Sequence, residues 1–206
     1  MNIFYLDNDP RKCAEQHNDK HVVKMILEYA QLLSTAHRVL DGIPRSEISL
    51  AGRRRTVYDL NDARDGSLYR ATHINHPSAI WCRLSTVNYD WLYVMWRELM
   101  DEYTYRYYKV HACEKLIKPL NRAPFNIASG EFTEPTPAMP DQYKVPGNSI
   151  QSYRNYYVGD KHEMSRWTDR TMPEWFADGI NKKYDQDCYM FYNKLGRAIS
   201  TSTIHI

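Results

Sequence analysis

Two long stretches of this chain repeat apolar residues at the spacing of an α-helix. The first runs from about Asp19 to Leu40, and Asp41-Gly42 closes it. The second runs from about 78 to 109 and follows His76-Pro77, where proline suits a first helical turn. Shorter stretches at 148–168 and 173–196 also suit helices. The patterns predict a mainly α protein, and we expect residues 1–206 to form a single helical domain.

The remaining segments lack helical spacing. Residues 3–6 form a short apolar run that predicts a strand or an extended N-terminal arm. Residues 42–75 mix turn-forming residues with six arginines, which favours short elements and loops. Six of the ten prolines lie between Pro119 and Pro146, where they exclude long helices and central strands. We therefore expect 118–148 to be an extended Pro-rich segment lying over the surface.

Composition excludes several classes of protein. No apolar run approaches the ~20 residues of a membrane span, and the N-terminus lacks the pattern of a secretory signal. The four cysteines lie at least 31 residues apart, which predicts reduced, mostly buried thiols. We expect a cytoplasmic protein with no membrane partner, no metal and no cofactor. A net charge of +2 does not by itself indicate a nucleic-acid binder.

A polar stripe follows the first helical pattern at steps of 4, 3, 4, 3, 4 and 3 residues. Its members are His17, His21, Lys24, Glu28, Gln31, Thr35 and Arg38, with Lys20 beside them. Residues at this spacing share one face of a helix. Imidazoles, amines and one carboxylate suit acid–base chemistry or an anionic ligand. The catalytic candidates are His17, His21, Lys24 and Glu28, and the substrate-binding candidates on this helix are Lys20, Gln31 and Arg38.

Two simpler interpretations of the stripe stay open. Lys24 and Glu28 are four residues apart, so they suit a local ion pair worth only ~0.3 kcal/mol of helix stability. His17 and His21 have the spacing of two metal ligands on one helix face, although no third ligand follows at a recognisable spacing.

Further basic and aromatic clusters add candidates for substrate binding. Those before and within the second helical pattern are His73, His76, Trp81 and Arg83, and imidazoles at a helix N-terminus suit phosphate. Arg106 and Lys109 stand among tyrosines at its end, and Arg154 stands in a similar segment. Basic groups among aromatic rings suit stacking and phosphate neutralisation. Structural roles, such as helix capping by His76, stay open, but together the clusters favour a nucleotide-containing ligand.

At these residues the chain resembles the pyrimidine dimer DNA glycosylases, the endonuclease V family of phages and bacteria. The carriers of the resemblance are His21 with Glu28 seven residues later, Asn75-His76-Pro77, Trp91-Leu92, Glu102-Tyr103, Arg106-Tyr107 and, loosely, 153–159. The resemblance covers roughly residues 1–111 plus that short piece. Residues 1–7 and 138–143 also look like tailed-phage proteins, so we expect a phage origin and a location in the host cytoplasm.

The resemblance implies a mainly helical enzyme that flips a base out of DNA and attacks the anomeric carbon with its N-terminal amine. An acidic residue, here Glu28, supports the resulting iminium, and a lyase step cleaves the strand. The sequence departs from the family at Asn2, which is bulky enough for Met1 to be retained, and at Leu27 and Gln31, which replace an arginine pair. Lys20 or Lys24 is the alternative source of the amine.

Three functions therefore compete. The first is a DNA glycosylase and AP lyase with an amine nucleophile and Glu28. The second is a phage anti-defence protein that cleaves or sequesters a small cyclic nucleotide with His17, His21 and Lys24. The third is a non-catalytic protein whose Tyr-rich surfaces bind a host protein. The partner is thus DNA, a small nucleotide or a protein, and a homo-oligomer stays open.

Overall fold

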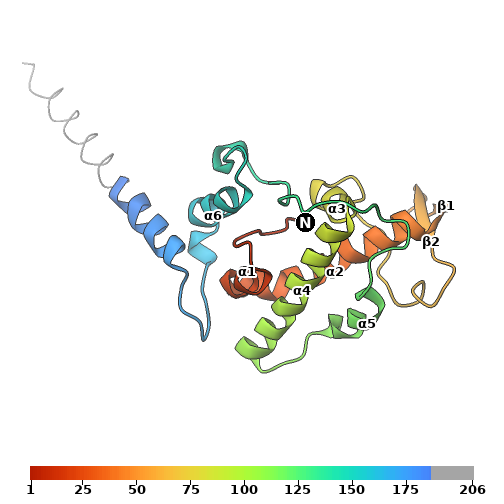
Figure 1. Cartoon of the computed structure of the whole chain (residues 1–206), viewed down its shortest axis with the longest axis horizontal. Coiled ribbons are helices and arrows are strands. Elements are labelled where there is room, and N and C mark those ends of the chain that lie inside the picture. The colour runs from red at the N-terminus through yellow and green to blue at the C-terminus, as the bar shows by residue number, and fades with distance from the viewer. Residues whose placement is uncertain (187–206) are drawn as a thin grey trace, which may run out of the picture.

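The computed structural model describes residues 1–186 and is mainly α, as the sequence predicts (Figure 1). The α-helices are α1 (Pro10–Gln16), α2 (Asp19–Asp41), α3 (Pro77–Cys82), α4 (Thr86–Tyr107), α5 (Ile117–Leu120) and α6 (Ser149–Asp160), and residues 174–186 are also helical. Short 3-10 helices are η1 (Ala112–Leu116), η2 (Asp141–Tyr143) and η3 (His162–Met164). The strands β1 (Ile43–Ile48) and β2 (Arg54–Asp59) form one antiparallel hairpin. No helix of residues 1–186 has the length and apolar character to cross a membrane.

The packing of α2 against α4 forms the centre of the core. Val22, Ile26 and Leu33 on α2 and Leu92 and Leu99 on α4 are all fully buried. A buried polar contact fixes the two helices, since the indole N–H of Trp96 donates to the carbonyl of Ile26 at 2.9 Å. The predicted helix at 19–40 is therefore confirmed.

Helix α2 begins and ends where its sequence predicts. The Asn18 side chain accepts from the backbone N–H of His21 and caps the first turn. Gly42 ends the helix, and a Cβ at this position would lie 2.4 Å from the carbonyl oxygen of Arg38. Glycine is thus required for the chain to turn sharply into β1.

The single helix predicted for 78–109 is wrong, because the chain breaks it into α3 and α4. Arg83 leaves helical geometry, and the Ser85 side chain accepts from the backbone N–H of Asn88 to begin α4. A serine cap satisfies a backbone donor that a continuous helix would have bonded to a carbonyl. The interruption allows α3 to leave the axis of α4 and to pack against α2.

The N-terminal residues form a buried extended arm. Ile3, Phe4, Tyr5 and Leu6 are all buried, and no strand pairs with them among residues 1–186. Side chains satisfy the backbone instead, since the N–H of Phe4 donates to the Tyr29 hydroxyl and Arg154 donates to the carbonyl of Leu6. The arm thereby brings the amine of residue 1 to Glu28, near the middle of α2.

The Pro-rich segment runs over the helices in an extended conformation, interrupted by η2 (Figure 1). Thr133 anchors it, because its carbonyl accepts from the indole of Trp81 and its backbone N–H donates to Asn88. The helix predicted for 148–168 is shorter than expected, since α6 ends at Asp160. The helix predicted for 173–196 is described from 174 to 186, and its remainder, like Cys188, lies outside the described residues.

Candidate functional site

A pocket of about 330 Å³ lies where the N-terminal arm meets α2 and α6. Its lining comprises Met1, Asn2, Phe4, Lys20, His21, Lys24, Met25, Glu28, Tyr156, Lys161 and Met164. Three distant parts of the chain therefore build this pocket. The polar side chains of α2 converge in it with the backbone amine of residue 1.

The carboxylate of Glu28 is the central acidic group of this pocket. One oxygen lies 3.6 Å from the Met1 amine, and the other lies 3.1 Å from Nζ of Lys24. The Glu28 side chain is 16% exposed, whereas that of Lys24 is 69% exposed. The predicted local ion pair therefore exists, but Glu28 also faces a second, much less exposed cation at the chain terminus.

His21 forms the inner wall of the pocket. Its Nδ1 lies 2.6 Å from the Tyr157 hydroxyl, and its ring stacks on Phe4 with 4.0 Å between centroids. Burial lowers its pKa well below 6.5, and the neighbouring His17, Lys161 and Lys24 lower it further. The ring is therefore neutral near pH 7. When the tyrosine O–H donates to Nδ1, the proton of the imidazole resides on Nε2.

Tyr156 and Lys161 form a second wall of the pocket. The Tyr156 ring is half-buried and nearly parallel to Phe4, with 9° between the planes. Nζ of Lys161 lies 4.6 Å from the centroid of the Tyr156 ring and 2.7 Å from the Asp160 carboxylate. Burial lowers the pKa of Lys161, but hydrogen bonds with Asp160 and Tyr156 outweigh it, so the pKa is raised and the amine is charged. This wall combines a flat aromatic face with a cation.

His76 lies outside the pocket but close enough to the N-terminal amine and Glu28 for their charges to act on it. Its Nδ1 accepts from the backbone N–H of Ser78 and caps α3, so the capping role is real. Burial lowers its pKa, and the N-terminal charge and His73 lower it further, whereas Glu28 opposes them. His73 is exposed and Gln31 is half-buried on the face of α2 that carries Glu28. None of these three lines the pocket itself.

His17 does not share the face of His21 as the stripe predicts. It follows α1 as its C-cap, before α2 begins, and is fully buried. One ring nitrogen contacts the carbonyl of Cys13 at 2.7 Å and the other contacts the Tyr29 hydroxyl at 3.0 Å. Because both nitrogens are occupied inside the core, the His17–His21 acid–base pair of the cyclic-nucleotide hypothesis is not formed. The His17–His21 metal pair is not formed either, and residues 1–186 contain no cluster of three potential metal ligands.

Arg38 also lies outside the pocket, at the far end of α2. Its guanidinium donates to the carbonyls of Tyr58, Asp65, Leu68 and Tyr69 and to the Asp65 carboxylate. The side chain is buried, and its N–H groups are used within the protein. Arg38 therefore holds the loop after β2 in place.

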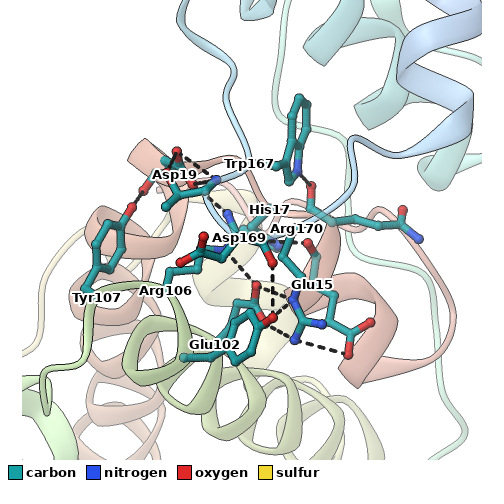
Figure 2. A network of polar contacts seen from close by, with 12 residues as sticks. Glu15, His17, Asp19, Glu102, Arg106, Tyr107, Trp167, Asp169 and Arg170 are labelled. Atoms are coloured by element: carbon teal, nitrogen blue, oxygen red, sulfur yellow. Dashed lines mark hydrogen bonds and ion pairs between the residues drawn. The ribbon is translucent and has the colours of Figure 1, made fainter.

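Arg106 belongs to a buried ionic network, shown in Figure 2. It donates to Glu102 at 2.6 Å, to Asp19 at 2.9 Å and to the carbonyl of Glu15. Arg170 reaches the same Glu102 carboxylate from the segment after α6. The network ties this segment to α1, α2 and α4, and Arg106 does not line the pocket.

The other binding candidates also lie outside the pocket. Trp81 is buried in the core, and Arg83 is half-buried at the end of α3. Lys109 is exposed beyond the C-terminus of α4. Arg154 holds the N-terminal arm and stacks over Trp175, 5.3 Å from the ring centroid. Of the residues that the sequence predicts for the site, the structure brings Lys20, His21, Lys24 and Glu28 together in the pocket. The other candidates lie elsewhere in the molecule.

Sequence reasoning did not select Tyr156, Tyr157 or Lys161. Tyr153, Tyr157 and Lys161 follow one another at four-residue steps, which places them on one face of α6. That spacing is the available signal. It does not indicate that the face packs on His21, because the contact spans 136 residues of sequence.

The comparisons with known proteins identify the family. Residues 1–115 match the family model described as pyrimidine dimer DNA glycosylase. The chain belongs to this family. No match came from the comparisons with curated proteins and with solved structures. Membership confirms the resemblance and indicates a function like that of pyrimidine dimer DNA glycosylases, with DNA as substrate; the phage origin stays a prediction.

The matched region holds one side of the pocket. Met1, His21 and Glu28 lie within residues 1–115, whereas Tyr156, Lys161 and Met164 lie beyond them. In this member of the family, the second wall of the pocket therefore comes from sequence outside the family match.

Proposed function

We propose that this protein is a DNA glycosylase and AP lyase that acts on pyrimidine dimers through the amine of its first residue and Glu28. The observation that carries the proposal is the distance of 3.6 Å between the Met1 amine and the Glu28 carboxylate, within a pocket. An amine nucleophile needs a neighbouring group that accepts its proton. Glu28 has the position for that role.

The chemistry follows from these two groups. The neutral amine attacks C1′ of the damaged nucleotide, the glycosidic bond breaks, and the base leaves with its electron pair and takes up a proton. Opening of the sugar gives an iminium between the amine nitrogen and C1′, which the Glu28 carboxylate stabilises. Glu28 then removes a proton from C2′, and the electron pair expels the 3′ phosphate. The product is an iminium conjugated to a new C2′=C3′ double bond, and its hydrolysis by water releases the cleaved strand as an unsaturated aldehyde and restores the amine.

The pocket also suits a nucleotide that has left the stack. Its volume is within the range of small-ligand sites, and the half-buried face of Tyr156 offers a platform for a base. Lys20, Lys24 and Lys161 surround it with positive charge. Cations beside an aromatic face suit a base and its attached phosphates.

The test uses three duplexes of one sequence, which carry a pyrimidine dimer, an abasic site or no damage. We expect strand cleavage of the first two only. Glu28→Gln should reduce the rate by ~10²–10⁴-fold, since general acid–base groups contribute this much. The two ion pairs of Glu28 are partly exposed to solvent, and such pairs contribute little to stability. The variant should therefore keep the free energy of unfolding of the wild type.

Glu131→Gln is the matched control, since Glu131 is exposed and does not line the pocket. It should cleave like the wild type. Absence of cleavage on both damaged duplexes, or full activity of Glu28→Gln, contradicts the proposal.

A further inference from the structure

The hairpin of β1 and β2 projects from the helical part of the molecule at the end of α2 (Figure 1). Its strands pair from Ile43 with Asp59 to Ile48 with Arg54, so residues 49–53 form the tip. Leu50 at the tip is fully exposed, and Ile48 is 70% exposed. These two apolar side chains are therefore free to contact another molecule at the tip.

The hairpin carries a concentrated positive charge. Six arginines of the hairpin and its base outnumber the three nearby carboxylates of Glu47, Asp59 and Asp65; they are Arg38, Arg45, Arg53, Arg54, Arg55 and Arg70. This local excess exceeds the net charge of +2 of the whole chain. The charge is therefore gathered here and balanced by acidic residues elsewhere.

The two arginines nearest the tip are available for a partner. Arg45 pairs with Asp59, and Arg55 and Arg70 share Glu47. Arg53 and Arg54 are exposed, and no ion pair holds either of them within the part of the chain that the structure describes. Unpaired guanidinium groups bind phosphate in a bidentate manner and are less strongly hydrated than ammonium groups.

The base of the hairpin is held rigidly. Arg38 donates from the end of α2 to the carbonyl of Tyr58 in β2 and to Asp65 in the following loop. A polar cleft of about 240 Å³ opens beside it and includes Arg55, Arg70 and Thr56 in its lining. The contacts of Arg38 thus fix the position of the hairpin base relative to α2.

The same helix connects the hairpin to the candidate active site. Glu28 and Asp41 are both on α2, and the 13 steps between them correspond to about 20 Å of helix rise. Duplex DNA rises about 3.4 Å per base pair. A duplex that follows α2 with one nucleotide in the pocket therefore reaches the hairpin after about six base pairs.

We propose that this hairpin grips the phosphate backbone of the undamaged duplex that flanks the lesion, with Arg53 and Arg54 as the main contacts. The inference rests on the proposed function, because the distance to the hairpin is measured from a nucleotide bound in the candidate active site. Charge favours DNA over a protein partner, and the apolar tip suits contact with sugars in a groove. The hairpin would thus add affinity that does not depend on damage.

The first test measures the affinity of an undamaged 30-base-pair duplex between 50 and 200 mM salt. Removing two phosphate contacts with Arg53→Ser/Arg54→Ser should lower the slope of log K against log salt by about 1.8. The ratio of the Kd values at the two salt concentrations should then fall about tenfold. Lys115→Ser/Lys118→Ser removes the same charge from exposed residues of η1 and α5, which lie apart from the hairpin (Figure 1), and should change the slope much less.

The second test uses borohydride trapping on two abasic duplexes. One is long, and the other has only four base pairs on each side of the abasic site, with its two strands joined at the ends by non-nucleotide linkers. The Arg53→Ser/Arg54→Ser variant should trap more slowly than the wild type on the long duplex, at subsaturating protein, and equally on the short one. The proposal is overturned if the variant traps as fast as the wild type on both duplexes, or if its salt slope is unchanged. It is also overturned if Lys115→Ser/Lys118→Ser lowers the salt slope by the same amount. Wild-type protein that binds with the expected salt slope but traps neither duplex instead overturns the proposed chemistry alone.

Discussion

The hydroxyl of Tyr157 lies 2.6 Å from Nδ1 of His21, although 136 residues separate them in the sequence. Both side chains are buried, so water does not compete for this contact. His21 lies in the family-matched region and Tyr157 lies outside it. The C-terminal part of the chain therefore fixes a pocket residue of the matched part.

Replacing Tyr157 by Phe should slow strand cleavage while the fold persists. The variant loses the hydroxyl contact to Nδ1, and one hydrogen bond is worth ~0.5–1.5 kcal/mol, which corresponds to about 2- to 13-fold in rate. A ¹⁵N NMR spectrum of His21 should also show a changed tautomer balance. Tyr153→Phe is the control, because Tyr153 is buried on the same helix but donates to the carbonyl of Thr136. An unchanged His21 spectrum in Tyr157→Phe would exclude the positioning role.

The ionic network of Arg106, Glu102 and Arg170 should be sensitive to loss of one carboxylate. Glu102 is 3% exposed and accepts from both Arg106 and Arg170. Glu102→Gln leaves the buried Arg106 guanidinium with Asp19 as its remaining carboxylate partner, which should lower the free energy of unfolding by ~1.5–3 kcal/mol, the contribution of a hydrogen bond to a charged group. Urea denaturation measures this difference.

Glu98→Gln is the control for the network, since Glu98 is half-buried one turn earlier on α4. Its carboxylate has no ion pair among residues 1–186. The free energy of unfolding should change by at most ~0.5 kcal/mol. Equal losses in the two variants would mean that the network does not stabilise the fold.

Stability should fall as the pH falls from 7 to 5. Burial lowers the pKa of His17 to about 4, and burial together with Arg64 lowers that of His37 to about 4. Between pH 6.5 and 4 the unfolded chain binds protons at these rings and the folded chain does not. The stabilisation is therefore present above pH 6.5 and is lost toward pH 4, by about 2 kcal/mol per histidine between pH 7 and 5.

Urea denaturation at pH 7, 6 and 5 checks this dependence. His37→Gln should show a shallower fall than the wild type, because one of the protonating groups is gone. A free energy of unfolding that stays constant or rises toward pH 5 would show that these rings are not held neutral.

The sequence predicts the helices better than it predicts what covers them. Helix α2 was predicted correctly because its apolar period and Gly42 are local signals. The break at Ser85 was missed, since an apolar period continues across it and only the cap marks the start of α4.

The same limit applies to the polar stripe. Its spacing places Glu28 and Arg38 on related faces of α2, but the neighbours decide their roles. The loop after β2 covers Arg38, whereas the N-terminal arm leaves Glu28 in an open pocket. Tyr157 could not be assigned to His21 at all, because no local pattern encodes a contact between distant helices.

The most direct test of the account is to locate the amine that attacks DNA. The protein is incubated with a duplex that carries an abasic site, reduced with borohydride, digested and analysed by peptide mass spectrometry. We predict that the DNA remnant is attached to the α-amine of the N-terminal peptide, at Met1 or at Asn2 after removal of Met1, since both residues line the pocket. A remnant attached to the side chain of Lys20, Lys24 or Lys161 would contradict the central role of the amine beside Glu28.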